Sequence, residues 1–416
     1  MSATAAAAVV IAVLLDAVVG EFPRRVHPVA LFGRVVGHVD RDWQRPRIVG
    51  TAVALLLPAV AGVVCWTVVV AGGGLASLLS VVLGGSFAGL PPVGSGLSNR
   101  VGVALTAGVV LFSTTSLRML VGAATDVIDA SADVAETAEG SPAADDSTDS
   151  VRSTTHDQRD ESADARAAAR ALVGRDTTGF SAAQFRSAAV ESAAENLADG
   201  FLAPLVAFAV GVQTAAVIGT APPVAVAVGA GAAGWVKAVN TLDSMLGYRS
   251  KPVGWASARL DDLVVWLPAR LTALVIAVAG LSPSALARAR RWADVPASPN
   301  SGWPMATLAV VLGVSVAKPD HYQLGEGDLP TVADARRGVR VVTTAALLGA
   351  LAVCVAVSAE IDWVIEAVAT AVVPTVTFSV VASPAMTFSV VASPAMTFSA
   401  VWLPTRTPTS GVVVWS

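Results

Sequence analysis

The stretch IVGTAVALLLPAVAGVVCWTVVV, residues 48–70, opens a run that contains no charged side chain before Arg100. A membrane hydrocarbon core about 30 Å thick is crossed by roughly 20 apolar residues in helical conformation. The run therefore predicts one transmembrane helix near 49–70 and a second, glycine-rich one near 74–90. This stretch alone indicates a membrane protein.

The composition of the whole chain points the same way. Of its 416 residues, 54% are hydrophobic and 14% are charged, whereas a soluble domain carries roughly 25% charged residues. This balance excludes an ordinary soluble enzyme and a disordered chain. The net charge of −4 leaves no basic surface typical of nucleic-acid binding. The two cysteines lie in apolar runs, which excludes a disulfide scaffold and the usual four-ligand zinc site.

Further apolar runs extend this interpretation outward from 48–70. They cover 4–20, 101–117, 200–236 and 341–358. We expect 4–20 to be a retained helix, and 200–236 is long enough for a helical hairpin broken at Pro222-Pro223. The run 264–281 is interrupted by Pro268 and Arg270, which favours a re-entrant helix. We expect an all-α polytopic integral membrane protein with about five to eight spans and cytoplasmic polar loops.

Arginine gives the expected orientation. The loops 21–47 and 282–340 are rich in arginine, and 235–262 carries further basic residues. The positive-inside rule places all three in the cytoplasm. Because 235–262 and 282–340 then share one side, the run 264–281 has to enter the membrane and return, which is a second argument for a re-entrant helix.

Two regions differ from the rest of the chain. Residues 126–165 hold twelve acidic side chains and two arginines, and we expect a disordered acidic insert because they cannot bury a core. The tail, 359–416, repeats TFSVVASPAM at 377–386 and 387–396, which matches no repeat class with a known fold. The preference for arginine over lysine together with the acidic insert indicates a salt-adapted organism, such as a halophilic archaeon.

Polar residues in so apolar a chain require an explanation, because an ionisable group is costly to bury in a membrane. The first polar segment is DAVVGEFPRRVHPVALFGR, residues 16–34. Its arginines Arg24, Arg25 and Arg34 have the charge to hold phosphate, and His27-Pro28 favours an extended backbone. The alternative is an interfacial anchor of arginines that extend their charged ends to the membrane surface.

The second segment is ESAAENLADGFLAP, residues 191–204. On a helix, Glu191, Glu195 and Asp199 fall on one face at spacings of four residues. Three carboxylates and Asn196 at the edge of an apolar run suit Mg²⁺, which takes oxygen ligands. A solvated helix face is the alternative.

The third segment is KAVNTLDSMLGYRSKPVGWASARLDD, residues 237–262. It combines cations with carboxylates, as phosphoryl transfer requires, although a salt-bridged cytoplasmic loop would have the same composition. The fourth is SPNSGWP, residues 298–304, a turn that leads into a short apolar helix. There Asn300 and Trp303 either line a pocket or pack on the membrane surface.

These segments, in this order, resemble the adenosylcobinamide-phosphate synthases of cobalamin biosynthesis, the CbiB/CobD family. The resemblance covers roughly 10–340 without the acidic insert, and it does not extend to the tail. The linker 247–254 looks short for the family. The matching stretches are HPVALFGR at 27–34, ESAAENLADGFLAP at 191–204, KAVNTLDSMLGY at 237–248, GWASARLDDLVVWLPARLTAL at 254–274 and SPNSGWP at 298–304.

The resemblance implies a multi-pass enzyme of the cell membrane with its active site on the cytoplasmic side. Such an enzyme is an ATP-dependent amide ligase that joins adenosylcobyric acid to aminopropanol phosphate, or a related amino alcohol, and it uses Mg²⁺. No P-loop motif is present, so ATP is not expected to be bound by one. The alternatives are a corrinoid transporter and a scaffold for other enzymes of cobalamin biosynthesis.

The resemblance and the four segments together assign expected roles. Residues 1–125 form an N-terminal membrane region with the HPV loop, and 166–358 form the catalytic membrane region. We expect catalytic roles for Glu195, Lys237, Asn240, Asp243, Arg259 and Asp262, ATP binding by His27, Arg34, Asn196 and Asn300, and Mg²⁺ binding by Glu191, Glu195, Asp199 and Asp243.

Overall fold

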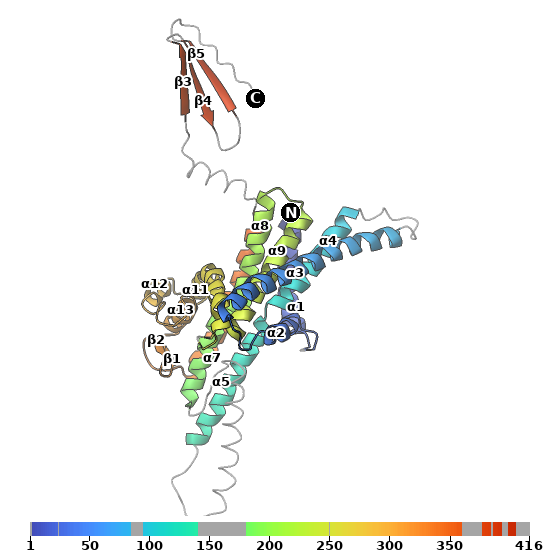
Figure 1. Cartoon of the computed structure of the whole chain (residues 1–416). Helices are drawn as coiled ribbons and strands as arrows, with labels where there is room; N and C mark the ends of the chain where they lie inside the picture. The colour runs from blue at the N-terminus through green and yellow to red at the C-terminus, as the bar shows by residue number, and fades with distance from the viewer. Residues whose placement is uncertain are drawn as a thin grey trace, which may run out of the picture. The chain divides into compact units, whose positions relative to one another are not determined.

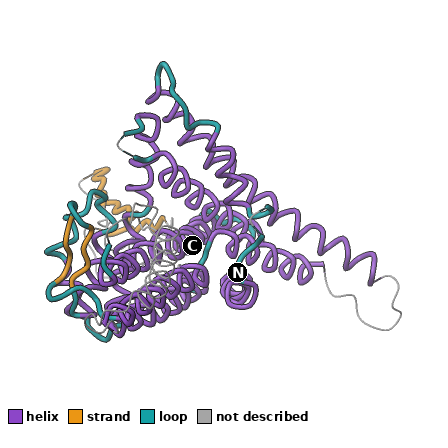
Figure 2. Tube along the Cα trace, turned by 90° about the horizontal axis from the view of Figure 1, so that it is seen from below, coloured by secondary structure: helices purple, strands orange, loops and turns teal. Residues whose placement is uncertain are grey.

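The computed structural model of the chain is almost entirely helical (Figure 1). It describes residues 2–23, 25–84, 95–139, 180–248 and 250–359, and three strands between 377 and 404. The helices are α1 (Ser2–Val19), α2 (Pro28–Gly37), α3 (Pro46–Gly84), α4 (Ser95–Thr114), α5 (Leu117–Glu139), α7 (Ala182–Asn196), the π-helix η1 (Leu197–Leu202), α8 (Ala203–Val217), α9 (Pro222–Leu246), the 3₁₀-helix η2 (Pro252–Gly254), α10 (Trp255–Val264), α11 (Trp266–Ala279), α12 (Ser284–Ala289), α13 (Gly302–Leu312) and α14 (Val332–Ser358). The strands are β1 (Ser315–Lys318), β2 (Tyr322–Gly325), β3 (Thr377–Ser383), β4 (Met386–Ala392) and β5 (Phe398–Pro404). Figure 2 shows the same predominance of helix from a second direction.

Five stretches of helix are long and apolar enough to cross a membrane, and a sixth is possible. The sixth is the pair formed by Pro252–Val264 and Trp266–Ala279, whose axes differ by 47°. These findings confirm the predicted polytopic, mainly helical membrane protein. The bent pair is compatible with a re-entrant segment, but the bend lies at Val265, and α11 continues through Pro268 and Arg270, where the interruption was predicted. The five stretches are Pro46–Val82, Gly96–Ala132, Ala182–Val217, Pro222–Leu246 and Val332–Ser358.

The region predicted to hold two spans, 49–70 and 74–90, forms one helix as far as Gly84. Three consecutive glycines at 72–74 do not interrupt α3, because α4 packs closely against it there. A Cβ on Gly102 of α4 would lie 2.7 Å from the carbonyl oxygen of Gly72. Helices in membranes associate closely through such small residues.

The helices α8 and α9 form the hairpin that Pro222-Pro223 predicted, and α3 packs along α9. A Cβ on Gly211 would lie 2.8 Å from the Cα of Gly229. Similarly, a Cβ on Gly62 of α3 would lie 3.0 Å from the carbonyl oxygen of Gly231 on α9. These glycines therefore set the separations of α9 from both neighbours.

The first helix is held where α4 ends and α5 begins. Gly20, with φ of 82°, ends α1. The buried Asp16 accepts a hydrogen bond from the backbone N–H of Arg118 at 2.9 Å, and the Arg118 guanidinium donates to the carbonyls of Ala17 and Val18 at 3.1 Å each. Each side chain thereby satisfies backbone groups at the end of the other helix.

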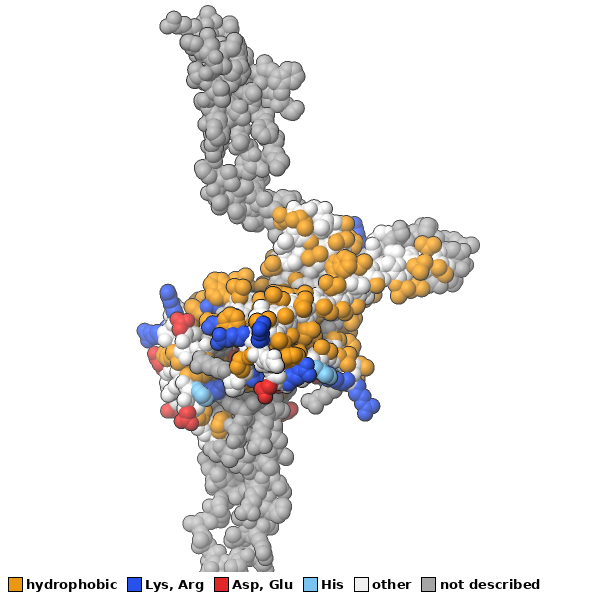
Figure 3. All heavy atoms as spheres, viewed as in Figure 1, with side chains coloured by type: hydrophobic (Ala, Val, Ile, Leu, Met, Phe, Trp, Pro, Cys, Tyr) orange, Lys and Arg blue, Asp and Glu red, His pale blue; other side chains and the backbone are white. Residues whose placement is uncertain are grey.

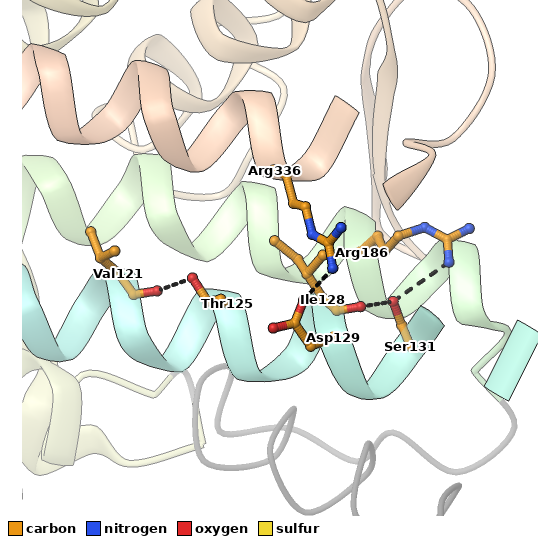
Figure 4. A network of polar contacts seen from close by, with 7 residues as sticks. All are labelled: Val121, Thr125, Ile128, Asp129, Ser131, Arg186 and Arg336. Carbon is orange, nitrogen blue, oxygen red and sulfur yellow. Dashed lines mark hydrogen bonds and ion pairs between the residues drawn. The ribbon is translucent and has the colours of Figure 1, made fainter. Parts of the chain in front are cut away.

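Polar contacts fasten α5 to α7 and α14 (Figure 4). Arg336 of α14 forms an ion pair with Asp129 at 2.8 Å. Arg186 of α7 donates to the Ser131 hydroxyl at 3.5 Å and to the carbonyl of Pro330 at 2.8 Å. We call Asp129, Ser131, Arg186 and Arg336 the arginine network.

The helix α5 corrects one predicted boundary. The acidic disordered insert was expected to begin at residue 126, but α5 continues to Glu139. Val127 and Ile128 are buried in the core, and this packing stabilises helix despite the acidic composition. Residues 140–165 of the predicted insert lie outside the described residues.

Beside the transmembrane helices, α13 is buried along almost its whole length, as expected for a helix that is apolar on every side. The antiparallel hairpin β1–β2 follows it. Figure 3 shows charged side chains gathered at one end of the described bundle and hydrophobic side chains over the rest. At such a polar surface Lys251 contacts Asp40 at 2.6 Å, so the predicted cytoplasmic loops 21–47 and 235–262 lie on one side.

Residues 359–416 form a separate unit. In this unit β3, β4 and β5 pair as an antiparallel sheet in sequence order. The two copies of TFSVVASPAM supply β3 and β4, in which Ser379 pairs with Ser389. Within the described residues, the membrane unit is thus helical as predicted apart from the short β1–β2 hairpin, and the other strands belong to the tail.

Candidate functional site

Four carboxylates from three separate segments of the chain come together in the membrane unit. Asp199 interacts electrostatically with the other three, and the cation Lys237 of α9 acts on it as well. Asn240, one turn after Lys237, hydrogen-bonds to the side chain of Asp261. We call these four residues the carboxylate cluster: Glu195 at the end of α7, Asp199 in η1, Asp243 on α9 and Asp261 on α10.

The π-helix η1 positions Asp199. Pro204 has no backbone N–H, and its ring would clash with the carbonyl four residues earlier in a regular α-helix. The preceding residues Leu197–Leu202 form the wider π turn that avoids this conflict. Single π turns inside α-helices are frequent at functional sites. Because of η1, the positions of Glu195 and Asp199 are not related by the regular rotation of an α-helix.

A close approach of two backbone segments positions Asp261. A Cβ on Gly254 would overlap the carbonyl group of Leu246, so glycine is required for α10 to begin directly beside the end of α9. Ser257 then donates to the Gly254 carbonyl at 2.9 Å. The short linker noted in the sequence is therefore the turn that brings Asp261 near Asp243.

Lys237 also connects the cluster to the segment before α2. Its charge interacts with Glu21, and both Lys237 and Glu21 act on His27. His27 caps α2, since its Nδ1 accepts a hydrogen bond from the backbone N–H of Val29 at 3.2 Å. Burial lowers the pKa of His27, Glu21 opposes this shift, and Lys237 adds to it.

The structure places Glu191 outside the carboxylate cluster. This residue was predicted to bind the same metal ion as Glu195 and Asp199, but it is buried and accepts a hydrogen bond from the Tyr322 hydroxyl at 2.8 Å. One turn earlier, Ser187 accepts a hydrogen bond from the backbone N–H of Ala317 at 2.8 Å. This face of α7 therefore holds the β1–β2 hairpin.

The charge of Asp262 acts on Asp243 and Asp261, so this predicted residue borders the carboxylate cluster. Asp262 also takes part, with Asn300, in a second polar contact. Asn300 is buried, donates to the carbonyl of Asp262 at 2.7 Å, and accepts from the Arg270 guanidinium at 2.6 Å. Arg270 lies over the rings of Trp266 and Trp303, 4.6 and 5.5 Å from their centroids. The turn at 298–304 is thus fastened to α10 and α11.

Three other predicted residues are at exposed positions. Arg259 lies 3.6 Å from the Asp262 carboxylate. Arg34 is in the last turn of α2. Asn196 donates to the hydroxyl and carbonyl of Ser192 at 3.0 Å each.

The sequence analysis predicted a catalytic role for Asp262 and none for its neighbour Asp261. The structure places Asp261 in the carboxylate cluster. Val253, Ser257, Asp261 and Val265 are all buried and recur every four residues. This periodicity marks the inward face of a helix, and it would have identified Asp261.

A cavity of about 70 Å³ lies next to the cluster, between α2, α3, α4 and α9. Phe32 and Cys65 contribute to its apolar wall, and Lys237 also lines it. Lys237 therefore borders both the cavity and the carboxylate cluster.

The oxygen atoms of the cluster are of the kind that Mg²⁺ prefers. Among the described residues, however, no three His, Cys, Asp or Glu side chains converge closely enough to hold a metal ion. A Mg²⁺ ion that accompanies a nucleotide takes one or two carboxylates and otherwise uses phosphates and water. The cluster is compatible with that mode of binding and not with an all-protein metal cage.

Comparisons with known proteins identify the family. A sequence model of the CobD/Cbib protein family matches residues 9–351. The chain is 30% identical to a probable cobalamin biosynthesis protein CobD of Methanothrix thermoacetophila over 351 residues, which are 82% of this chain and 93% of the relative. It is 33% identical to the cobalamin biosynthesis protein CobD of Rhizobium meliloti, over 82% of this chain and 90% of that protein.

A shorter match agrees. The chain is 39% identical to the cobalamin biosynthesis protein CbiB of Salmonella paratyphi A over 178 residues, which are 41% of this chain and 50% of the relative. No solved structure matches significantly. The family match covers the membrane unit that carries the carboxylate cluster, and the chain belongs to the CobD/CbiB family of cobalamin biosynthesis proteins.

Proposed function

We propose that this protein is an ATP-dependent amide ligase that joins adenosylcobyric acid to aminopropanol phosphate and gives adenosylcobinamide phosphate. The observation that carries this proposal is the gathering of Glu195, Asp199, Asp243 and Asp261 beside Lys237 and Asn240. These residues come from the stretches that resemble the synthases, and the family membership places the chain in cobalamin biosynthesis.

The reaction explains why such a cluster is needed. A carboxylate is a poor electrophile, so its oxygen first attacks the γ-phosphorus of ATP and displaces ADP. The amine nitrogen then attacks the acyl carbon, and phosphate leaves. The amine arrives as an ammonium ion and has to lose a proton before it attacks, which requires a general base.

The carboxylates of the cluster supply that base in this proposal. Glu195 and Asp261 lie at the ends of separate helices and accept the proton, while Asp199 and Asp243 are the candidates to hold Mg²⁺ with the phosphates. Mg²⁺ held by these residues would supply positive charge to the transferred phosphoryl group. Arg259 is exposed at the edge of this region and has the charge to contact the polyphosphate.

The loops that border the cluster face the cytoplasm in this proposal, in agreement with the positive-inside rule. Lys251 and Asp40 hold two of these loops together. ATP reaches the cluster from that side.

The decisive assay uses purified full-length protein in lipid nanodiscs with adenosylcobyric acid, Mg²⁺, ATP and aminopropanol phosphate. We expect stoichiometric formation of ADP, phosphate and adenosylcobinamide phosphate, identified by mass spectrometry. Uptake of corrinoid by sealed vesicles without ATP turnover would instead establish a transporter. Activity that appears only after addition of another cobalamin enzyme would establish a scaffold.

A further inference from the structure

The helix α10 is oriented in the opposite way to a helix on the surface of a water-soluble protein. Its buried residues, Ser257 and Asp261, are both polar. Its outer face carries Trp255 and Leu263, which are 51% and 73% exposed, and Trp266 follows directly with 53%. In water such a helix would bury its apolar side chains and expose its polar ones. The outer face of α10 is therefore suited to apolar surroundings.

The exposed apolar stripe continues along α11, whose axis differs from that of α10 by 47°. Its further members are Leu267, Leu274, Val278 and Leu281, all of them exposed. Leu281 follows the end of α11 with φ of 51°, a left-handed conformation that usually selects glycine at this position. The backbone therefore does not favour a leucine here, whereas contact of its side chain with lipid would.

A cation lies at the beginning of α10. The exposed Arg47, near the start of α3, has its guanidinium 5.9 Å from the centre of the Trp255 ring. The two helices begin side by side, since a Cβ on Gly50 would overlap the carbonyl group of Val253. Tryptophan and basic side chains concentrate where a membrane meets water. The pair of Arg47 and Trp255 therefore matches the level of phospholipid head groups.

The charge along the stripe favours an anionic partner. Asp261 and Asp262 are the only acidic residues between 255 and 281, and Asp261 is buried while Asp262 is half-buried. Arg270 lies over the ring of Trp266, so a cation accompanies this tryptophan as well. A second copy of the chain, related by a two-fold axis, would bring the same cationic surface against itself. Anionic phospholipid provides the opposite charge together with an apolar chain.

We propose that α10 lies in the membrane interface with its outer face in lipid, and that Arg47 and Trp255 bind the head group of an anionic phospholipid. The outer face then lies where head groups meet acyl chains, while Asp261 on the opposite face remains with the carboxylate cluster. The proposal goes beyond the ligase function and does not depend on it, because contact with lipid is measured without turnover.

A spin label measures the depth of α10 in the membrane. The full-length protein with Cys65→Ala and Cys354→Ala carries the label at Leu263→Cys, in bilayers of phosphatidylcholine and phosphatidylglycerol. Relaxation by oxygen, compared with relaxation by a water-soluble nickel chelate, gives the depth. We expect oxygen to dominate, at a depth of about 5–10 Å. The control label is His321→Cys, at an exposed position between β1 and β2, where the nickel chelate should dominate.

Three results for the label on α10 would overturn the proposal. Relaxation mainly by the nickel chelate would place the outer face in water. Protection from both reagents would mean that a protein partner or a second copy of the chain covers it. A depth near the centre of the bilayer would make α10 part of a membrane span.

Lipid binding by the protein with its native cysteines tests the head-group site separately. Native mass spectrometry of the full-length protein in detergent gives dissociation constants for phosphatidylglycerol and phosphatidylcholine. We expect Arg47→Gln to weaken binding of phosphatidylglycerol about fivefold, the scale of one basic side chain at an anionic surface, and to leave phosphatidylcholine unchanged.

The matched control for this measurement is Arg288→Gln. Because Glu326 already pairs with Arg288 at 3.6 Å, its loss should change either dissociation constant less than twofold. Equal binding of phosphatidylglycerol by Arg47→Gln and by the unaltered protein would overturn the assignment of the head group. An equal loss for both lipids would overturn its anionic character.

Discussion

Two polar regions of this membrane unit differ in how their charged side chains are partnered. In the arginine network, the carboxylate of Asp129 has the Arg336 guanidinium at 2.8 Å, and Arg186 donates to a hydroxyl and a carbonyl (Figure 4). In the carboxylate cluster, four acidic groups act on one another, and Lys237 is the cation that acts on Asp199. The one carboxylate of the network is thus paired with a guanidinium, whereas the cluster concentrates charges of one sign.

The contrast distinguishes residues with a structural role from residues with a proposed chemical role. A matched pair at a surface links α5 to α14 at little energetic cost or gain. Like charges held together oppose folding, and a chain tolerates them where their neutralisation by a ligand, a proton or a metal ion is useful. Substitutions in the two regions should therefore change different quantities, and the following predictions test this in order of expected size.

The largest effect is expected for Asp261→Asn. It removes one charge from the cluster and keeps the size of the side chain. We expect kcat to fall at least about 100-fold, which corresponds to roughly 2.7 kcal/mol of transition-state stabilisation. The temperature of unfolding should not fall, because repulsion among the remaining carboxylates is relieved. Ligase turnover and thermal unfolding in detergent measure both, and a stable variant with normal turnover would remove Asp261 from the site.

Glu195→Gln and Asp243→Asn should each lower kcat or raise the Mg²⁺ requirement at least about tenfold, the scale of roughly 1.4 kcal/mol. Mg²⁺ titrations of initial rates distinguish the two effects, with Asp129→Asn as the control that keeps normal turnover. Near-normal rates in both variants would contradict the proposed roles of Glu195 as a base and of Asp243 in Mg²⁺ binding. Loss of expression would support a salt-bridged loop instead.

Tyr322→Phe should act on folding. It removes the hydroxyl that donates to the buried Glu191, and a buried group that loses such a partner costs about 1–3 kcal/mol. The unfolding temperature should decrease, while kcat stays within about threefold. Tyr248→Phe is the matched control, since Tyr248 is 58% exposed. A large loss of kcat at unchanged stability would instead place Tyr322 in the reaction.

The cap of α2 should depend on pH. Because burial lowers the folded-state pKa of His27 below its ordinary value of about 6.5, the neutral ring stabilises α2 fully above that pH. This stabilisation is lost as the pH falls through the lowered pKa. An N-cap contributes about 1 kcal/mol, so hydrogen exchange of residues 29–36 should accelerate roughly fivefold beyond its intrinsic pH dependence.

The variant His27→Asn provides the control for this prediction. Asparagine caps helices without titrating, and α2 in this variant should show no excess acceleration at low pH. The same pH dependence in His27→Asn and in the unaltered protein would show that another group is responsible.

The smallest effect is expected in the arginine network. The side chains of Arg336 and Asp129 are 54% and 52% exposed, and exposed ion pairs contribute about 0–1 kcal/mol. Arg336→Gln should therefore lower the free energy of unfolding by less than about 1 kcal/mol, and less still at high salt. A double-mutant cycle with Asp129→Asn measures the pair itself, and a coupling well above that range would mean that the network does more than fasten α5.

Much of the membrane architecture could be predicted because hydropathy has a direct physical cause. The hairpin at Pro222-Pro223 was expected and is present, and the bent pair of α10 and α11 is compatible with the predicted re-entrant segment. The bend lies at Val265 and not at Pro268 and Arg270, because proline is accommodated in the first turn of α11. The single long helix α3 was not expected. Glycines 72–74 looked like the end of a span, and their close packing against α4 is a tertiary contact that composition does not reveal.

The site could be predicted only in part. Glu195, Asp199, Lys237, Asn240 and Asp243 were expected and do come together. Glu191 and Glu195 both lie in the regular helix α7, but the Tyr322 hydroxyl of the β1–β2 hairpin donates to Glu191, a long-range contact that the sequence does not reveal. The π-helix η1 begins only after Asn196, and it changes the rotation of Asp199 relative to Glu195. The assignment of Asp262 in place of Asp261 depended on which of two adjacent side chains faces inward, and that is set by the contact of Gly254 with Leu246.

The packing of α1 has a consequence for how the protein is made. α1 packs against α14, where Cys354 lies near the carbonyl of Ala6 across 348 positions of sequence. The first helix leaves the ribosome long before α14 exists, so the face of α1 that packs on α14 must remain in lipid or on an insertion factor throughout most of translation. Completion of the bundle is therefore a late event of synthesis, and a ribosome that stalls before α14 would leave the helices that pack on it, among them α1, α5, α7 and α11, without this neighbour.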